Sequence, residues 1–119
     1  MFTVGTIIKG SALRGKQLIK ILSNSLRQYN FQYKIGKNTD ILPFNPRGMC
    51  LAGGLYFTTI DNIFEFLLFG NKIAYVEVDD DEDIYVVKNE FKARTLTITK
   101  IEETFDNVIL SLKKEKANR

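Results

Sequence analysis

The sequence predicts a single α+β domain, with a mixed or mostly antiparallel sheet of about five or six strands and two or three helices packed against it. Three observations lead to this prediction. Several short segments alternate apolar and polar residues, as strands do, and others repeat apolar residues every three or four positions, as helices do. The length of 119 residues is close to the commonest size of one domain. We expect the domain to span residues 1–112 and residues 113–119 to form a frayed basic tail.

The first third of the chain predicts a strand, a helix and a second strand. Residues 2–8 are rich in β-branched side chains, which favour a strand. Apolar residues between Leu13 and Tyr29 recur mostly at three- and four-residue steps, which predicts a helix over residues 12–28 with Ser11 as its N-cap. Residues 31–35 predict a short strand that Gly36 ends.

The centre of the chain predicts a long loop followed by a strand. Residues 37–50 lack clear periodicity and carry both prolines, and loops of about a dozen residues in a compact domain tend to be functional. The stretch FNPRGMCLAGGLYFT, residues 44–58, adds the pair Gly53-Gly54 directly before an apolar strand at residues 55–57. Paired glycines permit unusual backbone angles or the close approach of another backbone or a ligand. We therefore predict that residues 37–58 form the working surface.

The rest of the chain predicts a helix, three strands and a last helix. Residues 61–69 are apolar almost all round, which predicts a short buried helix with Gly70 as its C-cap. Residues 73–78 alternate strictly and predict a strand, and residues 84–87 and 93–99 predict two more after a charged turn at 79–83. Residues 101–112 place apolar side chains on one face and predict an amphipathic helix.

The composition excludes several kinds of chemistry. The chain has no histidine and one cysteine, Cys50, so it cannot form the common Cys/His zinc sites, a Ser-His-Asp triad or a Cys-His nucleophile pair. A lone cysteine fits a reducing compartment, and no run approaches the roughly 18 apolar residues of a membrane span. We expect a soluble intracellular protein without a metal or cofactor, and the composition argues against an enzyme.

Charge is distributed unevenly along the sequence. Residues 1–39 carry seven Lys or Arg and no acid, whereas residues 77–83 carry six acids in seven positions. The acidic run lacks the glycine and the closing glutamate of an EF-hand, so we interpret it as a solvated turn. The basic segment has two interpretations. It packs near the acidic turn, or its helix binds nucleic acid, with Tyr29, Phe31 and Tyr33 stacking on bases.

Residues around the long loop are the candidates for binding a ligand or a partner. Arg47, between Pro46 and Gly48, offers a rigid guanidinium fork to an anion. The predicted set is Lys34, Asn38, Asn45, Arg47, Gly53, Gly54 and Tyr56.

Four segments carry a resemblance to a known kind of domain. They are YKIG at residues 33–36, FNPRGMC at 44–50, GGLYFT at 53–58 and IAYVEV at 73–78. Together they resemble a small uncharacterised domain found in large DNA viruses and some phages, over roughly residues 31–99. The resemblance implies a viral protein acting in the host cytoplasm, and it brings no known activity.

The GLYF run leading into a helix and a strand is also distantly similar to ADP-ribosyltransferase-like folds. That similarity implies an NAD cleft with Tyr56 beside the nicotinamide, and Glu77 or Glu90 as the acid that orients the ribose. The chain departs from both transferase motif sets: it has no histidine for one and no clear Arg, Ser-Thr-Ser and Glu-x-Glu set for the other.

These observations favour a non-catalytic binding or interaction module that uses residues 37–58 to recognise an unidentified protein partner. A transferase-like enzyme or a binder of NAD-derived nucleotides is the first alternative. Nucleic-acid binding through the basic N-terminal helix is the second.

Overall fold

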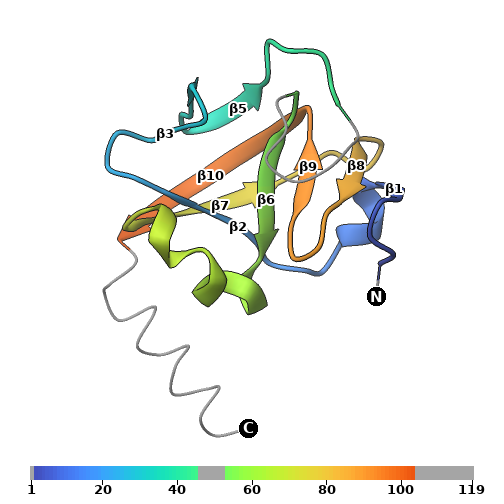
Figure 1. Ribbon diagram of the computed structural model, residues 1–119, viewed down its shortest axis with the longest axis horizontal. Helices are drawn as coiled ribbons and strands as arrows, with labels where there is room; N and C mark the ends of the chain where they lie inside the picture. The colour runs from blue at the N-terminus through green and yellow to red at the C-terminus, as the bar shows by residue number, and fades with distance from the viewer. Residues whose placement is uncertain (1, 46–52, 104–119) are drawn as a thin grey trace, which may run out of the picture.

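Antiparallel strands form most of the regular structure in the computed structural model, which describes residues 2–45 and 53–103. The elements follow one another along the chain with short 3-10 helices between some of the strands (Figure 1). In order they are β1 (Ile7–Lys9), η1 (Gly10–Leu13), β2 (Leu18–Leu22), β3 (Arg27–Gln28), β4 (Phe31–Gln32), β5 (Gly36–Thr39), β6 (Leu55–Thr59), η2 (Ile60–Glu65), η3 (Leu67–Phe69), β7 (Lys72–Glu77), β8 (Asp83–Val86), β9 (Phe91–Ala93) and β10 (Thr95–Glu103).

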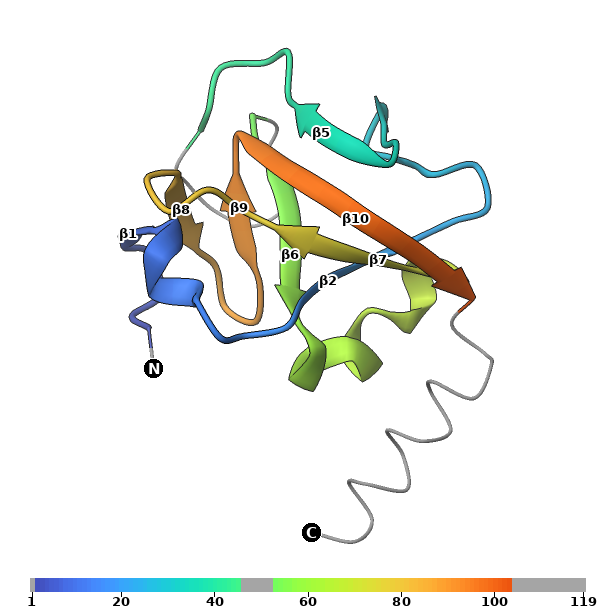
Figure 2. The same cartoon turned by 180° about the vertical axis from the view of Figure 1, so that it is seen from behind.

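In the described residues, an eight-stranded sheet runs in the order β1-β8-β9-β6-β2-β7-β10-β5, and β3 and β4 form a separate hairpin. Strand β6 joins the two halves of the sheet. Its first residues, Leu55 to Phe57, pair with β9, and its last two, Thr58 and Thr59, pair with β2. Beyond that point β6 and β2 diverge, and Figures 1 and 2 show β6 and β9 running across the direction of β7 and β10.

The sheet is buried on both sides at its centre. The main core takes residues from both halves, including Leu18 and Leu22 of β2 and Phe57 of β6. A second cluster lies on the other face of β2 and β7, where Ile19 and Ile21 pack against residues of η2 and η3. Within the described residues, no helix is long and apolar enough to cross a membrane.

The predicted α+β class with two or three helices is wrong for the described residues. Where the sequence predicted a helix over residues 12–28, the chain forms the end of η1, β2 and β3. Every residue of β2 is buried, because one of its faces meets the main core and the other meets η2 and η3. A strand buried on both faces has consecutive apolar residues, and such a run also satisfies helical spacing.

The other predicted helices differ as well. Residues 61–69 fall in the 3-10 helices η2 and η3, which meet at Phe66. A Cβ at Gly70 would lie 2.1 Å from the carbonyl oxygen of Leu22, so glycine allows the end of η3 to pass close to β2. Residues 101–103 extend β10, and the rest of the predicted C-terminal helix and tail lies outside the described residues.

Several predicted strands are confirmed with shifted bounds. The strands predicted at 55–57, 73–78 and 84–87 correspond to β6, β7 and β8. The strand predicted at 93–99 covers the end of β9 and the start of β10, which are separated at Arg94. The strand predicted at residues 2–8 is reduced to β1, and that at 31–35 is reduced to β4 in the hairpin.

Candidate binding groove

The β3–β4 hairpin forms one wall of a large cavity. Tyr29 and Asn30 connect the two strands and have positive φ angles of 50° and 66°. Two central residues with positive φ form the turn whose twist matches a hairpin. Leu26 also has a positive φ, and its carbonyl oxygen accepts a hydrogen bond from the Tyr33 amide at 2.8 Å. The turn therefore projects Tyr29, which is 58% exposed.

A cavity of about 590 Å³ lies between this hairpin, residues 40–42 and residues 53–56. We call it the hairpin groove. Most of the residues that line it are aromatic or aliphatic. Two of them, Ile41 and Leu42, lie opposite the hairpin and are 90% and 45% exposed. The lining residues are Gln28, Tyr29, Asn30, Phe31, Gln32, Tyr33, Asp40, Ile41, Leu42, Gly53, Gly54, Leu55 and Tyr56. The volume falls within the range of about 300–1,000 Å³ typical of ligand sites.

A buried lysine supports the groove where β2 and β6 diverge. The Nζ of Lys20 donates a hydrogen bond to the carbonyl oxygen of Tyr56 at 2.5 Å and lies 4.7 Å from the centre of the Tyr33 ring. Burial lowers the pKa of Lys20 to about 7, and the nearby Glu90 opposes part of that shift. Burial also raises the pKa of Tyr33 well above its ordinary value, and Asp40 adds to the shift. Lys20 thereby links β2 to β6, and its ammonium group lies against the Tyr33 ring.

A second buried lysine fixes the opposite wall. The Nζ of Lys92 donates to the carbonyl oxygen of Asn45 at 2.7 Å and lies 5.3 Å from the centre of the Tyr56 ring. Burial lowers the pKa of Lys92, and Asp40 opposes the shift. A Cβ at Gly54 would lie only 2.7 Å from the Cγ of Lys92, so this glycine makes room for the lysine stem.

Residues 40–45 are tied to the start of β6 through main-chain groups. The carboxylate of Asp40 accepts hydrogen bonds from the amides of Leu42 at 3.1 Å and Gly54 at 2.8 Å. The Asn45 amide donates to the carbonyl oxygen of Gly53 at 2.7 Å. A Cβ at Gly53, whose φ is 93°, would lie 2.4 Å from the carbonyl oxygen of Pro43. The glycine pair thus permits the close backbone approach that its sequence suggested.

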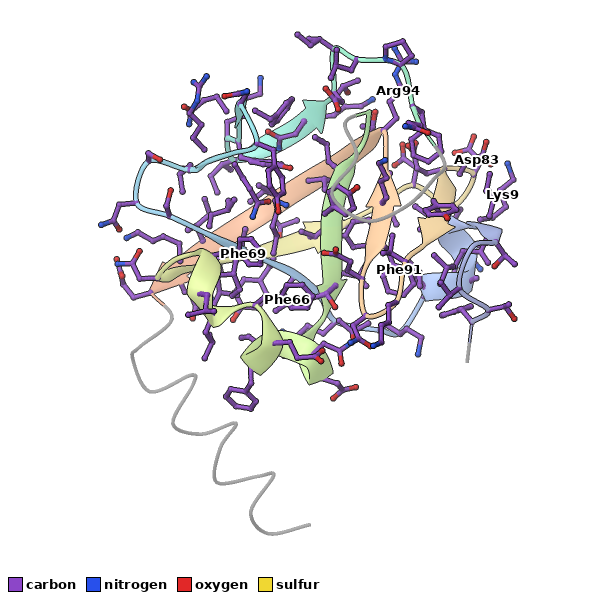
Figure 3. The ribbon with its side chains drawn as sticks, viewed as in Figure 1. Lys9, Phe66, Phe69, Asp83, Phe91 and Arg94 are labelled. Carbon is purple, nitrogen blue, oxygen red and sulfur yellow. The ribbon has the colours of Figure 1, made fainter. Side chains whose placement is uncertain are left out.

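A smaller pocket of about 60 Å³ adjoins the hairpin groove and shares Gln28, Tyr29 and Tyr56 with it. Lys20 and Glu90 line one part of this pocket, and Phe66 and Phe69 of the η2–η3 segment line another. Figure 3 shows these two phenylalanines on the η2–η3 segment, and their rings stack 6.2 Å apart. Burial raises the pKa of Glu90, and Lys20 opposes that shift.

The structure brings together only part of the predicted site. Gly53, Gly54 and Tyr56 line the hairpin groove, and Asn45 anchors its wall through Lys92. Asn38 is 2% exposed, and its side chain bonds to main-chain groups of residues 34 and 36, so it holds a turn. Lys34 is exposed on that turn. Arg47 and Cys50 lie outside the described residues.

The transferase-like set does not converge on one large cleft. Tyr56 and Glu90 both line the smaller pocket, whose volume is far below that of a typical ligand site. Glu77 lines a different pocket with Gly10 and Arg14. Among the described residues, no group of three or more carboxylate or thiol side chains is arranged to hold a metal ion.

Two residues of the basic segment pair with the acidic turn, as the first interpretation predicted, although no helix carries them. Lys9 pairs with Asp83 at 2.6 Å, and Arg14 pairs with Asp80. Figure 3 shows Lys9 and Asp83 side by side at the β1–β8 edge. The helix that was predicted to carry the nucleic-acid surface is absent from these residues.

Sequence reasoning missed Lys20 and Lys92 as parts of the site, and it included Ile41 and Leu42 in the predicted working surface without naming them as binding residues. The first two had a recognisable signal, because each lysine interrupts an otherwise apolar strand. A charged residue in the middle of a buried strand is rare unless it has a partner. For the exposed residues Ile41 and Leu42, the one indication in the sequence was their position in the predicted long loop.

Comparison with known proteins finds two similar chains in one giant virus. The chain is 36% identical over 64 residues to one ankyrin repeat protein of Acanthamoeba polyphaga mimivirus, covering 53% of this chain and 21% of that protein. It is 36% identical over 73 residues to a second ankyrin repeat protein of the same virus, covering 60% and 22%. The chain thus spans about a fifth of the length of the curated relatives it matches. No protein-family model matches, and no solved structure matches.

Proposed function

We propose that this chain is a non-catalytic recognition module of a viral protein, and that it binds an extended apolar segment of a protein partner in the hairpin groove. The observation that carries the proposal is the groove itself. It has a volume of about 590 Å³ and is open between the Tyr29 turn and the exposed Ile41-Leu42 pair. Grooves lined by aromatic side chains take up extended peptide segments, whose side chains fill the spaces between the rings.

The chemistry of the wall favours a peptide over a charged small molecule. Among the described lining residues, Asp40 is the one charged side chain, and its carboxylate already accepts hydrogen bonds from the amides of Leu42 and Gly54. The amide side chains of Gln28 and Asn30 offer hydrogen bonds to a peptide backbone. Contiguous exposed apolar surface of this kind marks interaction sites.

The similar viral proteins support a role as one module in a longer recognition protein. An ankyrin repeat is about 33 residues long and contains two helices. The described residues of this chain form an antiparallel sheet with 3-10 helices, so its fold differs from that of the repeats. We therefore propose that the shared segment is a separate β-rich module that occurs in the same chains as the repeats. Two binding modules in one chain raise overall avidity without new contacts.

A selection experiment tests the proposed function. The purified protein is used to select peptides from a random 12-residue display library, and synthetic copies of enriched peptides are measured by fluorescence anisotropy. We expect Tyr29→Ser and Ile41→Ser to weaken binding at least about tenfold, because both remove exposed groove surface. Leu68→Ser is the matched control: Leu68 is 99% exposed and does not line the hairpin groove.

Two outcomes would contradict the proposal. One is a selection that enriches no peptide; the other is binding that survives both groove substitutions and is lost in Leu68→Ser. The same protein is heated with NAD or ADP-ribose, and we expect its Tm to stay unchanged. A clear rise would instead favour a nucleotide site, because a ligand at about 100 times its Kd adds roughly 2.7 kcal/mol of stability.

A further inference from the structure

The basic residues around the hairpin groove differ in environment from Lys9, Arg14 and Lys20. Lys9 and Arg14 are in ion pairs, and Lys20 is buried. Arg27, Lys34 and Lys37 are exposed, and none of them has an ion pair within residues 2–45 and 53–103. They come from the acid-free first 39 residues.

These three cations flank the residues that line the groove. Arg27 directly precedes Gln28 in β3, and Lys34 directly follows Tyr33. Asn38 accepts a hydrogen bond from the Lys34 amide and donates to the carbonyl oxygens of residues 34 and 36, which holds Lys34 and Lys37 on one tight turn. The main chain of this turn and of Arg27 therefore adjoins the hairpin wall.

The loop side of the groove carries a further cation. The Arg94 carbonyl oxygen accepts a hydrogen bond from the Asp40 amide at 2.9 Å, and the residue is exposed. Figure 3 shows Arg94 near the loop that leads away from β5. The segment of β10 opposite β5, Thr95 to Ile98, contains no acid. Two carboxylates lie on this side: that of Asp40 accepts hydrogen bonds from two amides, and that of Glu82 accepts one from the Thr95 amide at 3.1 Å.

We propose that the segment bound in the hairpin groove is acidic: an apolar centre fills the groove, and Asp or Glu residues on either side meet Arg27, Lys34, Lys37 and Arg94. This inference rests on the proposed function and names the chemistry of its partner. The apolar wall supplies affinity, and the flanking cations supply selectivity and a faster association rate.

An acidic peptide fits this surface better than a nucleic acid does. Single-stranded nucleic acids need open ring faces on which successive bases stack. The Phe31 and Tyr33 rings pack against each other at 4.7 Å, and Tyr33 is 4% exposed with the Lys20 ammonium beneath it. The opposite wall is formed by the aliphatic side chains of Ile41 and Leu42, which suit apolar side chains.

Three matched peptide pools test the inference. Each pool consists of fluorescent 12-residue peptides with the same randomised apolar and aromatic centre, flanked by Asp and Glu, by Ser and Asn, or by Lys and Arg. In 50 mM salt we expect the acidic pool to bind about tenfold more tightly than the neutral pool and the basic pool to bind most weakly. Raising the salt to 500 mM is expected to bring the acidic and neutral pools together, because salt screens exposed charges.

A charge-reversal pair locates the effect. We expect Lys34→Glu to weaken binding of the acidic pool roughly threefold and to strengthen binding of the basic pool, which is the size of effect that one exposed charge pair produces. Lys16→Glu is the matched control, since Lys16 is also exposed but lines a different pocket with Gly10 and Glu77. It changes the net charge equally and is expected to leave all three affinities unchanged.

The outcomes separate this inference from the proposed function. If all pools bind equally and Tyr29→Ser weakens each of them, the groove binds peptides but the acidic preference is overturned. If no pool binds, the proposed function itself fails. If a 12-nucleotide oligothymidine binds more tightly than the acidic pool and Tyr29→Ser weakens it, the partner is a nucleic acid and the inference is overturned.

Discussion

Lysines at the β1 edge and in the interior strands of the sheet have opposite environments. At the β1–β8 edge, Lys9 pairs with Asp83 while both side chains remain more than half exposed. Beneath the hairpin groove, Lys20 and Lys92 are almost fully buried, and each ammonium donates to a main-chain carbonyl oxygen. Lys9 has a carboxylate partner and is exposed to solvent, whereas Lys20 and Lys92 each lie against a carbonyl oxygen and a tyrosine ring.

The difference between the exposed Lys9 and the buried Lys20 and Lys92 indicates which contacts maintain the shape of the groove. An exposed ion pair contributes little, because water and salt screen it and two long side chains lose freedom. A buried ammonium costs free energy unless its hydrogen bonds are satisfied, so its position is set by its acceptors. Lys20 joins β2 to β6, and Lys92 joins β9 to residue 45, at the places where neighbouring strands separate or a loop returns.

The largest expected effect comes from filling the space that the Lys92 stem occupies. Gly54→Ala places a Cβ 2.7 Å from the Cγ of Lys92, at a φ of 137° that side chains rarely adopt. We expect it to lower the free energy of unfolding by about 3 kcal/mol, from backbone strain and overpacking together. Urea denaturation measures the change.

Gly15→Ala provides the control for this substitution. Gly15 also has a positive φ, 82°, but nothing lies within 4 Å of its Cβ position. The control is expected to cost about 1 kcal/mol, from strain alone. Equal losses in the two variants would show that Lys92 can move aside, and that the buried lysine does not fix this wall.

The next effect is a pH dependence that Lys20 creates. Its pKa is lowered from 10.5 to about 7 in the folded protein, so the unfolded chain binds more protons between these values. Stability therefore rises with pH across this window. From pH 7 to pH 9 we expect a gain of about 2 kcal/mol in the free energy of unfolding.

Lys20→Met tests the assignment of that slope. The substitution keeps a similar stem and removes the titrating amine, so the rise between pH 7 and pH 9 should disappear. Lys37→Met is the control, because Lys37 is exposed and its removal leaves the buried amine in place. A slope that survives in Lys20→Met would assign the pH dependence to another group.

A smaller, local effect is expected from Lys92. Lys92→Met removes the hydrogen bond to the Asn45 carbonyl oxygen, which joins β9 to the loop wall. We expect the Asn45 amide, which bonds to Gly53, to exchange with solvent roughly tenfold faster, because the local opening free energy falls by about 1 kcal/mol. Hydrogen exchange measured by NMR checks this, and the β7 amide of Val76 serves as the internal reference.

The strands could be predicted from sequence where one face is buried and the other is polar or partly exposed. Strand β7 places Ala74 and Val76 on one face, in the main core, and Ile73, Tyr75 and Glu77 on the other face, where exposure increases towards Glu77; its period of two was recognisable. Strand β2 is buried on both faces, and its run of apolar residues fits a helix equally well. The choice between them depends on η2 and η3 covering its second face, which is a tertiary contact that local sequence does not encode.

The site was predictable only in part for a similar reason. The Gly53-Gly54 pair indicated a close approach, and the structure shows the approaching groups, Pro43 and the Lys92 stem. The opposite wall depends on a hairpin whose turn residues, Tyr29 and Asn30, are not the usual Asn-Gly pair. A turn of unusual composition is recognised from backbone angles rather than from residue type.

The smallest effect on stability is expected from the exposed ion pair at the β1–β8 edge. Lys9→Met breaks the ion pair with Asp83, and we expect the urea midpoint at pH 7 to remain within experimental error of the unmodified protein. The Asp83 carboxylate stays hydrated when its partner is removed, so no buried charge is left unsatisfied. A fall in the midpoint as large as that of Gly54→Ala would mean that the β1–β8 edge is held by its charges. The buried lysines would then not contribute more to the structure around the groove than an exposed ion pair does.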